Sequence, residues 1–314
     1  MIAALAGGVG GARLCAGLAA VLAPHELTVA VNTGDDFEHL GLSISPDLDS
    51  VMYTLAGRHD TARGWGLAGE SWRCMEALKA LSGDDWFRLG DQDLATHLHR
   101  TQRLREGRRL SEVTRELCQA LGVRHTVLPM TNGLLRTRIL SDAGELAFQD
   151  YFVRHRCEPR FLGTRFEGEA HPTVELLAAL GSPSTQAIVI CPSNPFLSIH
   201  PLLALPGTRQ ALASRGAVAI AVSPVVGGAA VKGPLAKMMR ELGLPVSPVE
   251  IARLYQGLID GLVIDVADAA QAPAIEALGI AVSVQHTLMG DLPRQQALAE
   301  GALGFARGLR RRDQ

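Results

Sequence analysis

Short apolar segments alternate with helix-like segments over most of this 314-residue chain, and this alternation constrains its fold more than any other feature. A short apolar run followed by a 3.6-residue apolar periodicity is typical of a strand and then a helix, and repeated units of this kind build a parallel sheet. The sequence therefore predicts an α/β protein with a Rossmann-like, mostly parallel sheet. The expected strands are residues 1–5, 27–32, 127–129, 187–190, 218–222, 262–265 and 280–284.

Two segments depart from this alternation. Residues 64–122 carry more polar, helix-like patterns and predict a helical insertion over one edge of the sheet. Residues 133–166 contain two strand-like runs around a Ser-Asp-Ala-Gly turn at 141–144, which predicts a small antiparallel excursion with a hairpin. Because no long linker separates these parts, we expect residues 1–314 to form a single domain.

The composition is that of an ordinary globular protein, with 47% hydrophobic residues and a net charge of −2. No basic excess indicates nucleic acid as a partner, and the one charge run, at residues 310–312, is expected to be a solvated end. No apolar run approaches the length of a membrane span, and the apolar start lacks the basic segment of a signal peptide. The five scattered cysteines, without a Cys-x-x-Cys pair, favour a reducing compartment over a zinc site. We therefore expect a cytoplasmic protein.

The first apolar segment runs into a glycine-rich turn, Gly7-Gly8-Val9-Gly10-Gly11-Ala12-Arg13, and a helix is expected from about Arg13 until Pro24. The spacing matches neither the Walker motif nor the dinucleotide fingerprint. Either the turn lets strand and helix pack closely, or its backbone amides and the helix N-terminus bind a phosphate. Arg13 favours the anion, because a cation in the first helical turn opposes the helix dipole. The candidate phosphate-binding residues are Gly8, Gly10, Gly11 and Arg13.

A second turn, after residues 27–32, is followed by four closely spaced carboxylates: Asp35, Asp36, Asp47 and Asp49. Like charges this close raise one another's pKa unless a cation neutralises them. Mg²⁺ takes oxygen ligands and usually binds together with substrate phosphates. The alternative is a solvated acidic loop. The turn leaves the carboxyl end of a buried strand, where open α/β sheets bind ligands, and this favours the magnesium site.

Asp49 is expected on a rigid element. Ser45-Pro46-Asp47 supplies a capping residue, a proline at the first helical position and an acid in the first turn, which predicts a helix from about Pro46 through Leu55. Further along the chain, His97 and His99 are two residues apart, so a helix would place them on different faces and they are not expected to share a metal ion. The stretch from Trp86 to Asp91 could form a packed corner or the wall of a ligand site.

Six blocks spread over nearly the whole chain resemble the 2-phospho-L-lactate transferase family. They are Gly7 to Arg13, Asn32 to Asp36, Ile44 to Asp49, Leu89 to His97, Pro192 to Pro195 and Ser223-Pro224. The resemblance implies a Mg²⁺-dependent homodimer that acts in the biosynthesis of coenzyme F420. It also implies transfer of a phospholactate, phosphoenolpyruvate or phosphoglycerate moiety from a guanosine diphospho-linked donor. The acceptor would be the ribityl hydroxyl of 7,8-didemethyl-8-hydroxy-5-deazariboflavin (FO), with release of GMP.

The resemblance also implies roles for individual residues. Asp49 and Arg88 correspond to positions at the deazaflavin, and Asp49 is in addition a candidate metal ligand or the base that orients the attacking hydroxyl. Asp35 is the first choice for direct contact with Mg²⁺ and for catalysis, with Asp36 as its neighbour or substitute. Polar groups at strand ends are candidates for nucleotide contacts or, alternatively, for local turn capping. These are Asn32, Gly34, Asp36, Ser193 and Asn194.

Two other functions stay open at the level of sequence. One is a non-catalytic, UDP-sugar-binding regulator of the gluconeogenesis-factor type, which shares a glycine loop and an Asp-Asp-Gly-like turn. The other is a metal-dependent phosphohydrolase, which needs the same carboxylates but no deazaflavin pocket. Spacing does not select the transferred acid, and His286 stands where members of the resembling family usually carry an acid.

Overall fold

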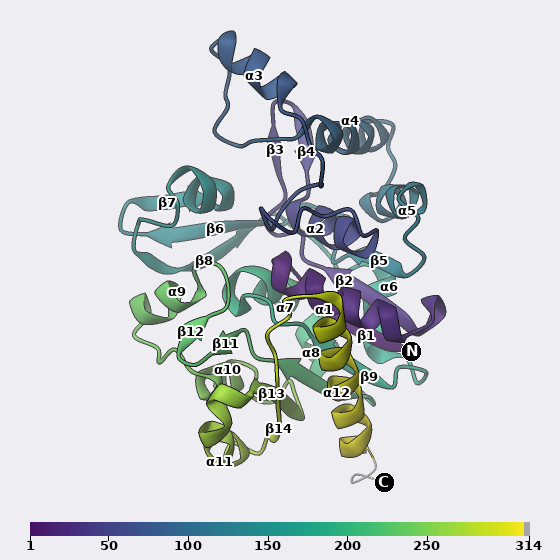
Figure 1. The fold of residues 1–314 in the computed structure, drawn as a ribbon, viewed down its shortest axis with the longest axis vertical. Helices are drawn as coiled ribbons and strands as arrows, with labels where there is room; N and C mark the ends of the chain where they lie inside the picture. Colours follow the sequence, from purple (N-terminus) through teal and green to yellow (C-terminus); the bar gives the residue numbers. More distant parts are fainter. Residues whose placement is uncertain (311–314) are drawn as a thin grey trace.

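A seven-stranded parallel sheet forms the centre of the computed structural model, which describes residues 1–310 (Figure 1). The spatial order of its strands is β14-β13-β10-β9-β1-β2-β5. The strands are β1 (Ile2–Ala6), β2 (Leu27–Val31), β5 (Thr126–Pro129), β9 (Ala187–Ile190), β10 (Val218–Val222), β13 (Gly261–Asp265) and β14 (Ala281–Gln285). The predicted α/β class and parallel sheet are confirmed. The first and last residues of each predicted strand lie within one residue of the observed ones. The expected solvated end at 310–312 lies outside the described residues, apart from the backbone of Arg310.

The strand order reverses between β1 and β9. The chain first builds β1, β2 and β5 on one side, and later returns to build β9, β10, β13 and β14 on the other. In open α/β sheets, ligands bind outside the carboxyl ends of the strands at such a switch point. The loops that begin at Gly7 and Cys191 leave the sheet there, so this edge is where a site is expected.

Helices cover both faces of the sheet. Ile2 and Ala4 of β1 point into one hydrophobic core, while Ala3 and Leu5 point into another on the opposite face, as the two-residue period of a strand requires. On the first face lie α1 (Gly8–Val21), α2 (Pro46–Leu55) and α12 (Leu292–Arg310). On the second lie α6 (Val174–Gly181), α7 (His200–Ala204), α8 (Thr208–Ala213), α9 (Leu235–Glu241), α10 (Pro248–Leu254) and α11 (Ala272–Glu276).

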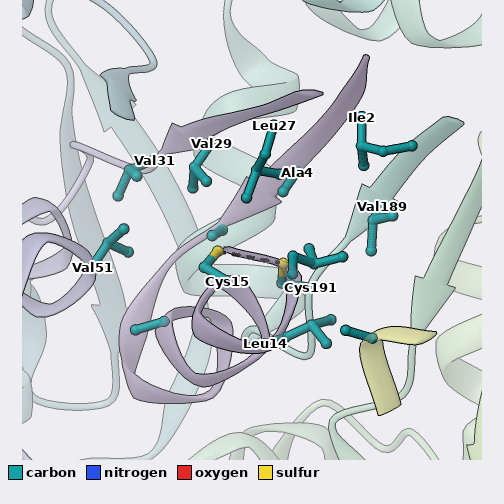
Figure 2. Close-up of a cluster of buried hydrophobic side chains, with 14 of the residues drawn as sticks. Ile2, Ala4, Leu14, Cys15, Leu27, Val29, Val31, Val51, Val189 and Cys191 are labelled. Atoms are coloured by element: carbon teal, nitrogen blue, oxygen red, sulfur yellow. Dashed lines mark hydrogen bonds between the residues drawn. The ribbon is translucent and has the colours of Figure 1, made fainter. Parts of the chain in front are cut away.

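Figure 2 shows part of the first core, in which α1 packs on β1, β2 and β9. Cys15 of α1 and Cys191 after β9 lie there with their Sγ atoms 3.9 Å apart. All five cysteines are free thiols in the structure. Within residues 1–310, no helix has the length and apolar character to cross a membrane.

Helix α1 begins earlier than predicted, at Gly8 instead of near Arg13. The glycines therefore belong to the first turns of the helix and not to a preceding loop. They allow close packing: a Cβ at Gly10 would collide with the carbonyl oxygen of Pro192, and a Cβ at Gly11 would lie 2.6 Å from Ser193 Oγ. The helix dipole argument for Arg13 is weaker than predicted, because Arg13 lies beyond the first turn.

Smaller elements rise from the carboxyl edge of the sheet (Figure 1). The predicted antiparallel hairpin is present as part of a three-stranded sheet in the order β7-β6-β8. The hairpin β3–β4 was not predicted, because its turn at Leu40 and Gly41 places a leucine at a φ of 53°, without the usual Asn-Gly signal. The remaining elements are β3 (Phe37–His39), β4 (Leu42–Ile44), α3 (Arg73–Ala80), α4 (Asp91–Arg105), α5 (Leu110–Ala120), β6 (Arg136–Ser141), β7 (Gly144–Ala147), β8 (Phe161–Glu167), β11 (Val225–Val226) and β12 (Ala229–Ala230).

Candidate active site

A cleft of about 660 Å³ opens at the carboxyl edge of the parallel sheet, beside the switch point. Loops after β1, β2, β9, β10 and β14 supply its floor, and α2, α4 and the 148–156 segment supply its walls. Its volume falls within the range of small-molecule and cofactor sites. Most of the predicted site residues line it: Gly8, Gly10, Arg13, Asn32, Asp35, Asp49, Arg88, Ser193 and Asn194.

Asp35 and Asp47 form a buried acidic pair that one amide group joins. Asn32 Nδ2 donates to Asp35 Oδ1 (3.1 Å) and to Asp47 Oδ2 (2.9 Å). Burial raises the pKa of Asp47 to about 6. Burial, followed by the charges of Asp47 and Asp36, raises the pKa of Asp35 well above its usual value. The pair is therefore short of positive charge, as expected for carboxylates that bind a cation or a proton.

Asp47 also determines how α1 begins. Its Oδ1 accepts a hydrogen bond from the Gly8 backbone N–H (2.6 Å), while Ser193 Oγ accepts one from the N–H of Gly7 (3.1 Å). A carboxylate from α2 thus occupies the N-terminus of α1, where a phosphate was predicted. The next two residues, Val9 and Gly10, line the cleft.

Asp36 points to a second cavity of about 450 Å³. Its Oδ2 accepts a hydrogen bond from the Ser45 hydroxyl (2.7 Å), and its buried Oδ1 has no hydrogen-bond partner among the described residues. Burial raises the pKa of Asp36 to about 7, although the charge of Arg136 acts in the opposite direction. Because Asp35 lines both cavities, it lies where they meet.

Asp49 belongs to a different network, in which every member is buried. Both of its carboxylate oxygens accept hydrogen bonds from Arg100, through Nη1 (3.1 Å) and Nη2. Arg100 Nη1 also lies 3.1 Å from His97 Nδ1, and His97 Nε2 lies 3.2 Å from Asp93 Oδ2. Asp93 Oδ1 accepts a hydrogen bond from the Tyr53 hydroxyl (2.6 Å). Side chains from α2 and α4 therefore hold Asp49 in place.

Arg100 supplies positive charge to this network of buried acids. Burial lowers the pKa of Arg100, but Asp49 outweighs burial and the net pKa is raised. Burial raises the pKa of Asp93, but the nearby His97 and the hydrogen bond from Tyr53 outweigh burial, and the net pKa is lowered. Ligand atoms of Asp49, Asp93 and His97 lie within 4.8 Å of one another, close enough for a metal ion. The guanidinium of Arg100 already supplies positive charge there, so a second cation is not required.

His97 and Arg100 are functional candidates for which the sequence carries no local signal, since their partner Asp49 is about fifty residues away. His97 is buried in the wall of the cleft. His99 lies on the other side of α4, where its Nε2 is 3.7 Å from Glu116 Oε2. The two histidines do not share a site, as predicted.

Aromatic side chains form another wall of the cleft. Trp86, Phe87, Phe148 and Phe152 line it, and the guanidinium of Arg88 lies 4.6 Å from the ring centre of Trp72, which holds Arg88 in place. Phe87 also packs edge-on against Phe37 with 4.8 Å between ring centres, so this stretch forms a packed corner and also lines the cleft. Such a wall offers ring faces and edges to a planar heterocycle.

Several predicted nucleotide-binding groups have local partners. The Asn194 side chain accepts hydrogen bonds from the N–H groups of Phe196 and Leu197 and so caps the segment that follows it. Gly34 lines only the second cavity, and a Cβ there would lie 2.7 Å from Thr137 Oγ1. His286 is exposed and is not among the lining residues of the cleft.

The fold and the site define an α/β protein with a cleft of small-molecule size beside the switch point of its parallel sheet. The family model for the 2-phospho-L-lactate transferase CofD matches residues 2–291, and the chain belongs to this family. It is therefore a transferase with a phosphoacid-transfer role in coenzyme F420 biosynthesis, which confirms the resemblance and sets aside the regulator and the phosphohydrolase.

Curated relatives match nearly the whole chain. It is 39% identical over 317 residues to the phosphoenolpyruvate transferase of Streptomyces griseus, covering 98% of this chain and 99% of the relative. It is 36% identical over 301 residues to the 2-phospho-L-lactate transferase of Methanosarcina acetivorans, covering 96% and 97%. A crystal structure of a UPF0052 family member from Bacillus halodurans shares the fold, with a TM-score of 0.61, 17% identity, and coverage of 96% of this chain and 98% of that one.

Replacing Arg100 by leucine should destabilise the protein by about 3–5 kcal/mol, because it leaves the carboxylate of Asp49 buried without a counter-charge. Arg103→Leu is the matched control on the same helix. Arg103 binds Glu106 and Glu116, but these ion pairs are solvent-accessible, so their loss should change stability little. Urea unfolding measures both changes in the free energy of unfolding. Equal effects of the two variants would contradict the assigned role of Arg100.

The contribution of Asp36 to the stability of the metal-free protein should fall as pH rises from about 4 to about 7. The folded-state pKa of Asp36, about 7, exceeds its usual value of 3.8, so the folded state holds the proton more tightly than the unfolded state. This contribution is complete below about pH 4 and is lost as pH passes through the folded-state pKa. Asp36→Asn is neutral at every pH and should flatten the decline in urea unfolding measured with a chelator present. An unchanged slope would show that Asp36 does not titrate in this way.

Proposed function

We propose that the protein transfers a phosphorylated three-carbon acid from a guanosine diphospho-linked donor to the ribityl hydroxyl of FO, with release of GMP and with Mg²⁺ as cofactor. One observation carries the proposal: a single cleft joins a buried acid cluster to an amide- and cation-lined wall and to an aromatic wall. The first wall suits a diphosphate and the second a deazaflavin ring. The names of the two kinds of relative support transfer of either phospholactate or phosphoenolpyruvate.

The donor is proposed to lie over the start of α1. Gly7 and Gly8 donate their N–H groups to protein acceptors, which leaves the amides of Val9 and Gly10 and the guanidinium of Arg13 for the donor phosphates. Asn32, Ser193 and Asn194 line the same cleft. In this proposal, the polar atoms of these three side chains that make no hydrogen bond within the protein orient the nucleotide.

The acid cluster fits Mg²⁺. Asp35 and Asp47 are buried, bridged by Asn32 and without an ion pair among the described residues, and their raised pKa values indicate a shortage of positive charge. Asp49 is the other candidate ligand, but Arg100 already pairs with both of its oxygens, so Asp35 and Asp47 are the first choice for the metal ion. A bound Mg²⁺ would neutralise charge on the donor diphosphate.

The acceptor is proposed to lie against the aromatic wall, with its ring near Arg88 and its ribityl chain directed to the acids. Because Asp35 is assigned to Mg²⁺, Asp49 is the carboxylate left to accept the proton of the attacking hydroxyl. Asp49, held by Arg100, orients that hydroxyl. Phosphoryl transfer depends mainly on positioning and charge stabilisation, so no covalent intermediate is required. Family resemblance adds a cytoplasmic homodimer to the proposal.

The test is a turnover assay with purified protein, Mg²⁺, FO and each guanosine-linked donor, read by mass spectrometry of the phosphodiester and by GMP release. One donor should give product. Asp35→Asn should lower kcat by at least about a hundredfold, as expected for loss of a ligand of the catalytic metal ion, and Asp49→Asn should also lose product through loss of the base. The control is Asp85→Ala, whose carboxylate pairs with Lys79 away from the cleft and should not matter. GMP release that does not depend on FO would contradict the proposal.

A further inference from the structure

Arg13 and Lys232 bring two cations to the same cleft without an acidic partner. Arg13 projects from α1, and Lys232 lies in the loop between β12 and α9. Arg13 makes one long hydrogen bond, from Nη1 to the Met289 carbonyl oxygen (3.4 Å). Lys232 Nζ donates to the Gly64 carbonyl oxygen (3.0 Å). Within residues 1–310, neither forms an ion pair with a carboxylate.

The positive charges of Arg13 and Lys232 are close enough to repel each other. Burial, and then the charge of Arg13, lowers the pKa of Lys232. Burial and Arg13 also lower the pKa of His59, with Asp60 acting in the opposite direction. Gathering cations in a partly buried place is unfavourable unless an anion neutralises them. The nearby Arg63 shows the contrast, because its guanidinium is paired with Asp60.

The Gly64 carbonyl belongs to a loop, residues 58–68, that is ordered by its own contacts. The Asp60 carboxylate accepts hydrogen bonds from the N–H groups of Ala62 (2.9 Å) and Arg63 (2.8 Å), and the Asp60 N–H donates to the Gly66 carbonyl oxygen (2.9 Å). The turn therefore holds the Gly64 carbonyl in place as the acceptor for Lys232. The two residues are 168 positions apart in the sequence.

The donor inventory shows what this arrangement can bind. An ammonium group has three N–H donors, of which Gly64 takes one from Lys232. A guanidinium has five, of which Met289 takes one from Arg13. Several charged donors thus remain for a ligand beside the amides of Val9 and Gly10.

We propose that Arg13 and Lys232 form an anion-binding subsite for the donor, with the Gly64 carbonyl as the group that orients Lys232. The identity of the donor rests on the proposed function, to which this adds Lys232 and the 58–68 loop. The anion is a phosphate or the carboxylate of the transferred acid. Proximity to the start of α1 favours the diphosphate.

The first test is calorimetric binding of inorganic pyrophosphate, GDP, guanosine and phosphoenolpyruvate to wild-type protein, Lys232→Met and Lys232→Arg. Lys232→Met should weaken pyrophosphate and GDP binding about tenfold or more, through loss of a charge-assisted hydrogen bond, and leave guanosine unchanged. Lys232→Arg should retain most of the affinity. The control is Lys79→Met, which makes the same change in net charge at an exposed position.

The probes separate the two sources of the anion. Weaker binding of pyrophosphate and GDP identifies a phosphate subsite, and weaker binding of phosphoenolpyruvate alone identifies a carboxylate subsite. Wild-type affinity of Lys232→Met for all probes would overturn the proposal. Because binding is measured without FO or turnover, this outcome is independent of whether the transfer reaction itself is observed.

A second pair of variants tests the role of Gly64. Gly64 and Gly57 both have positive φ angles, 75° and 66°, so alanine strains the backbone similarly at either position. A Cβ at residue 64 would lie 2.5 Å from Lys232 Nζ, whereas a Cβ at residue 57 meets no atom within 4 Å. Gly64→Ala should weaken pyrophosphate binding, and Gly57→Ala should not. Equal affinities would remove Gly64 from the subsite.

Discussion

Three carboxylates buried at the carboxyl edge of one sheet are the constraint on which the site depends. Asp35, Asp36 and Asp47 have no ion-pair partner within residues 1–310, and burial raises the pKa of each. Uncompensated buried charge is costly, so polar neighbours must hold these groups. Asn32 and the Gly8 amide do so, and in the same contacts they tie β2, α2 and the start of α1 together. The same hydrogen bonds therefore fix both the start of the glycine-rich helix α1 and the positions of the buried acids.

Asp49 lies two residues after Asp47 in the sequence but, unlike Asp47, it has an ion-pair partner. Arg100 neutralises it, and His97, Asp93 and Tyr53 extend the contact into the wall of the cleft. The cleft thus contains one set of acids short of positive charge and one acid already supplied with it. This division suits a reaction in which one carboxylate accepts a proton or a metal ion while another keeps the acceptor oriented.

Much of the fold could be predicted from local sequence. The strands β9 and β10 read as uninterrupted apolar runs because both faces of a parallel sheet are buried, and Ser45-Pro46-Asp47 marks the start of α2. The β3–β4 hairpin could not be predicted, since its turn depends on a leucine with positive φ. The early start of α1 depends on acceptors supplied by Asp47 and Ser193, which are distant in sequence.

The location of the site could be predicted from the sequence, but the hydrogen bonds and ion pairs between its residues could not. The glycine and acidic blocks identified the edge of the sheet, but the role of Asp47 as a helix cap and partner of Asp35 arises only when α1 and α2 meet. Arg100 and Lys232 lie far along the chain from Asp49 and Gly64, and no spacing rule joins such pairs. Long-range packing, rather than residue type, selects them.

Calorimetric titration of the protein with Mg²⁺ near pH 6.5, in buffers of different ionisation enthalpy, shows whether the buried acid cluster binds a cation in place of protons. The Asp47 carboxyl group, with a pKa of about 6, is partly protonated at this pH, and the pKa of Asp35 is raised well above its usual value, so a cation that binds these two groups must displace protons. We expect Mg²⁺ binding with net proton release, and smaller release in Asp35→Asn. Absence of Mg²⁺ binding, or binding without proton release, would contradict this expectation.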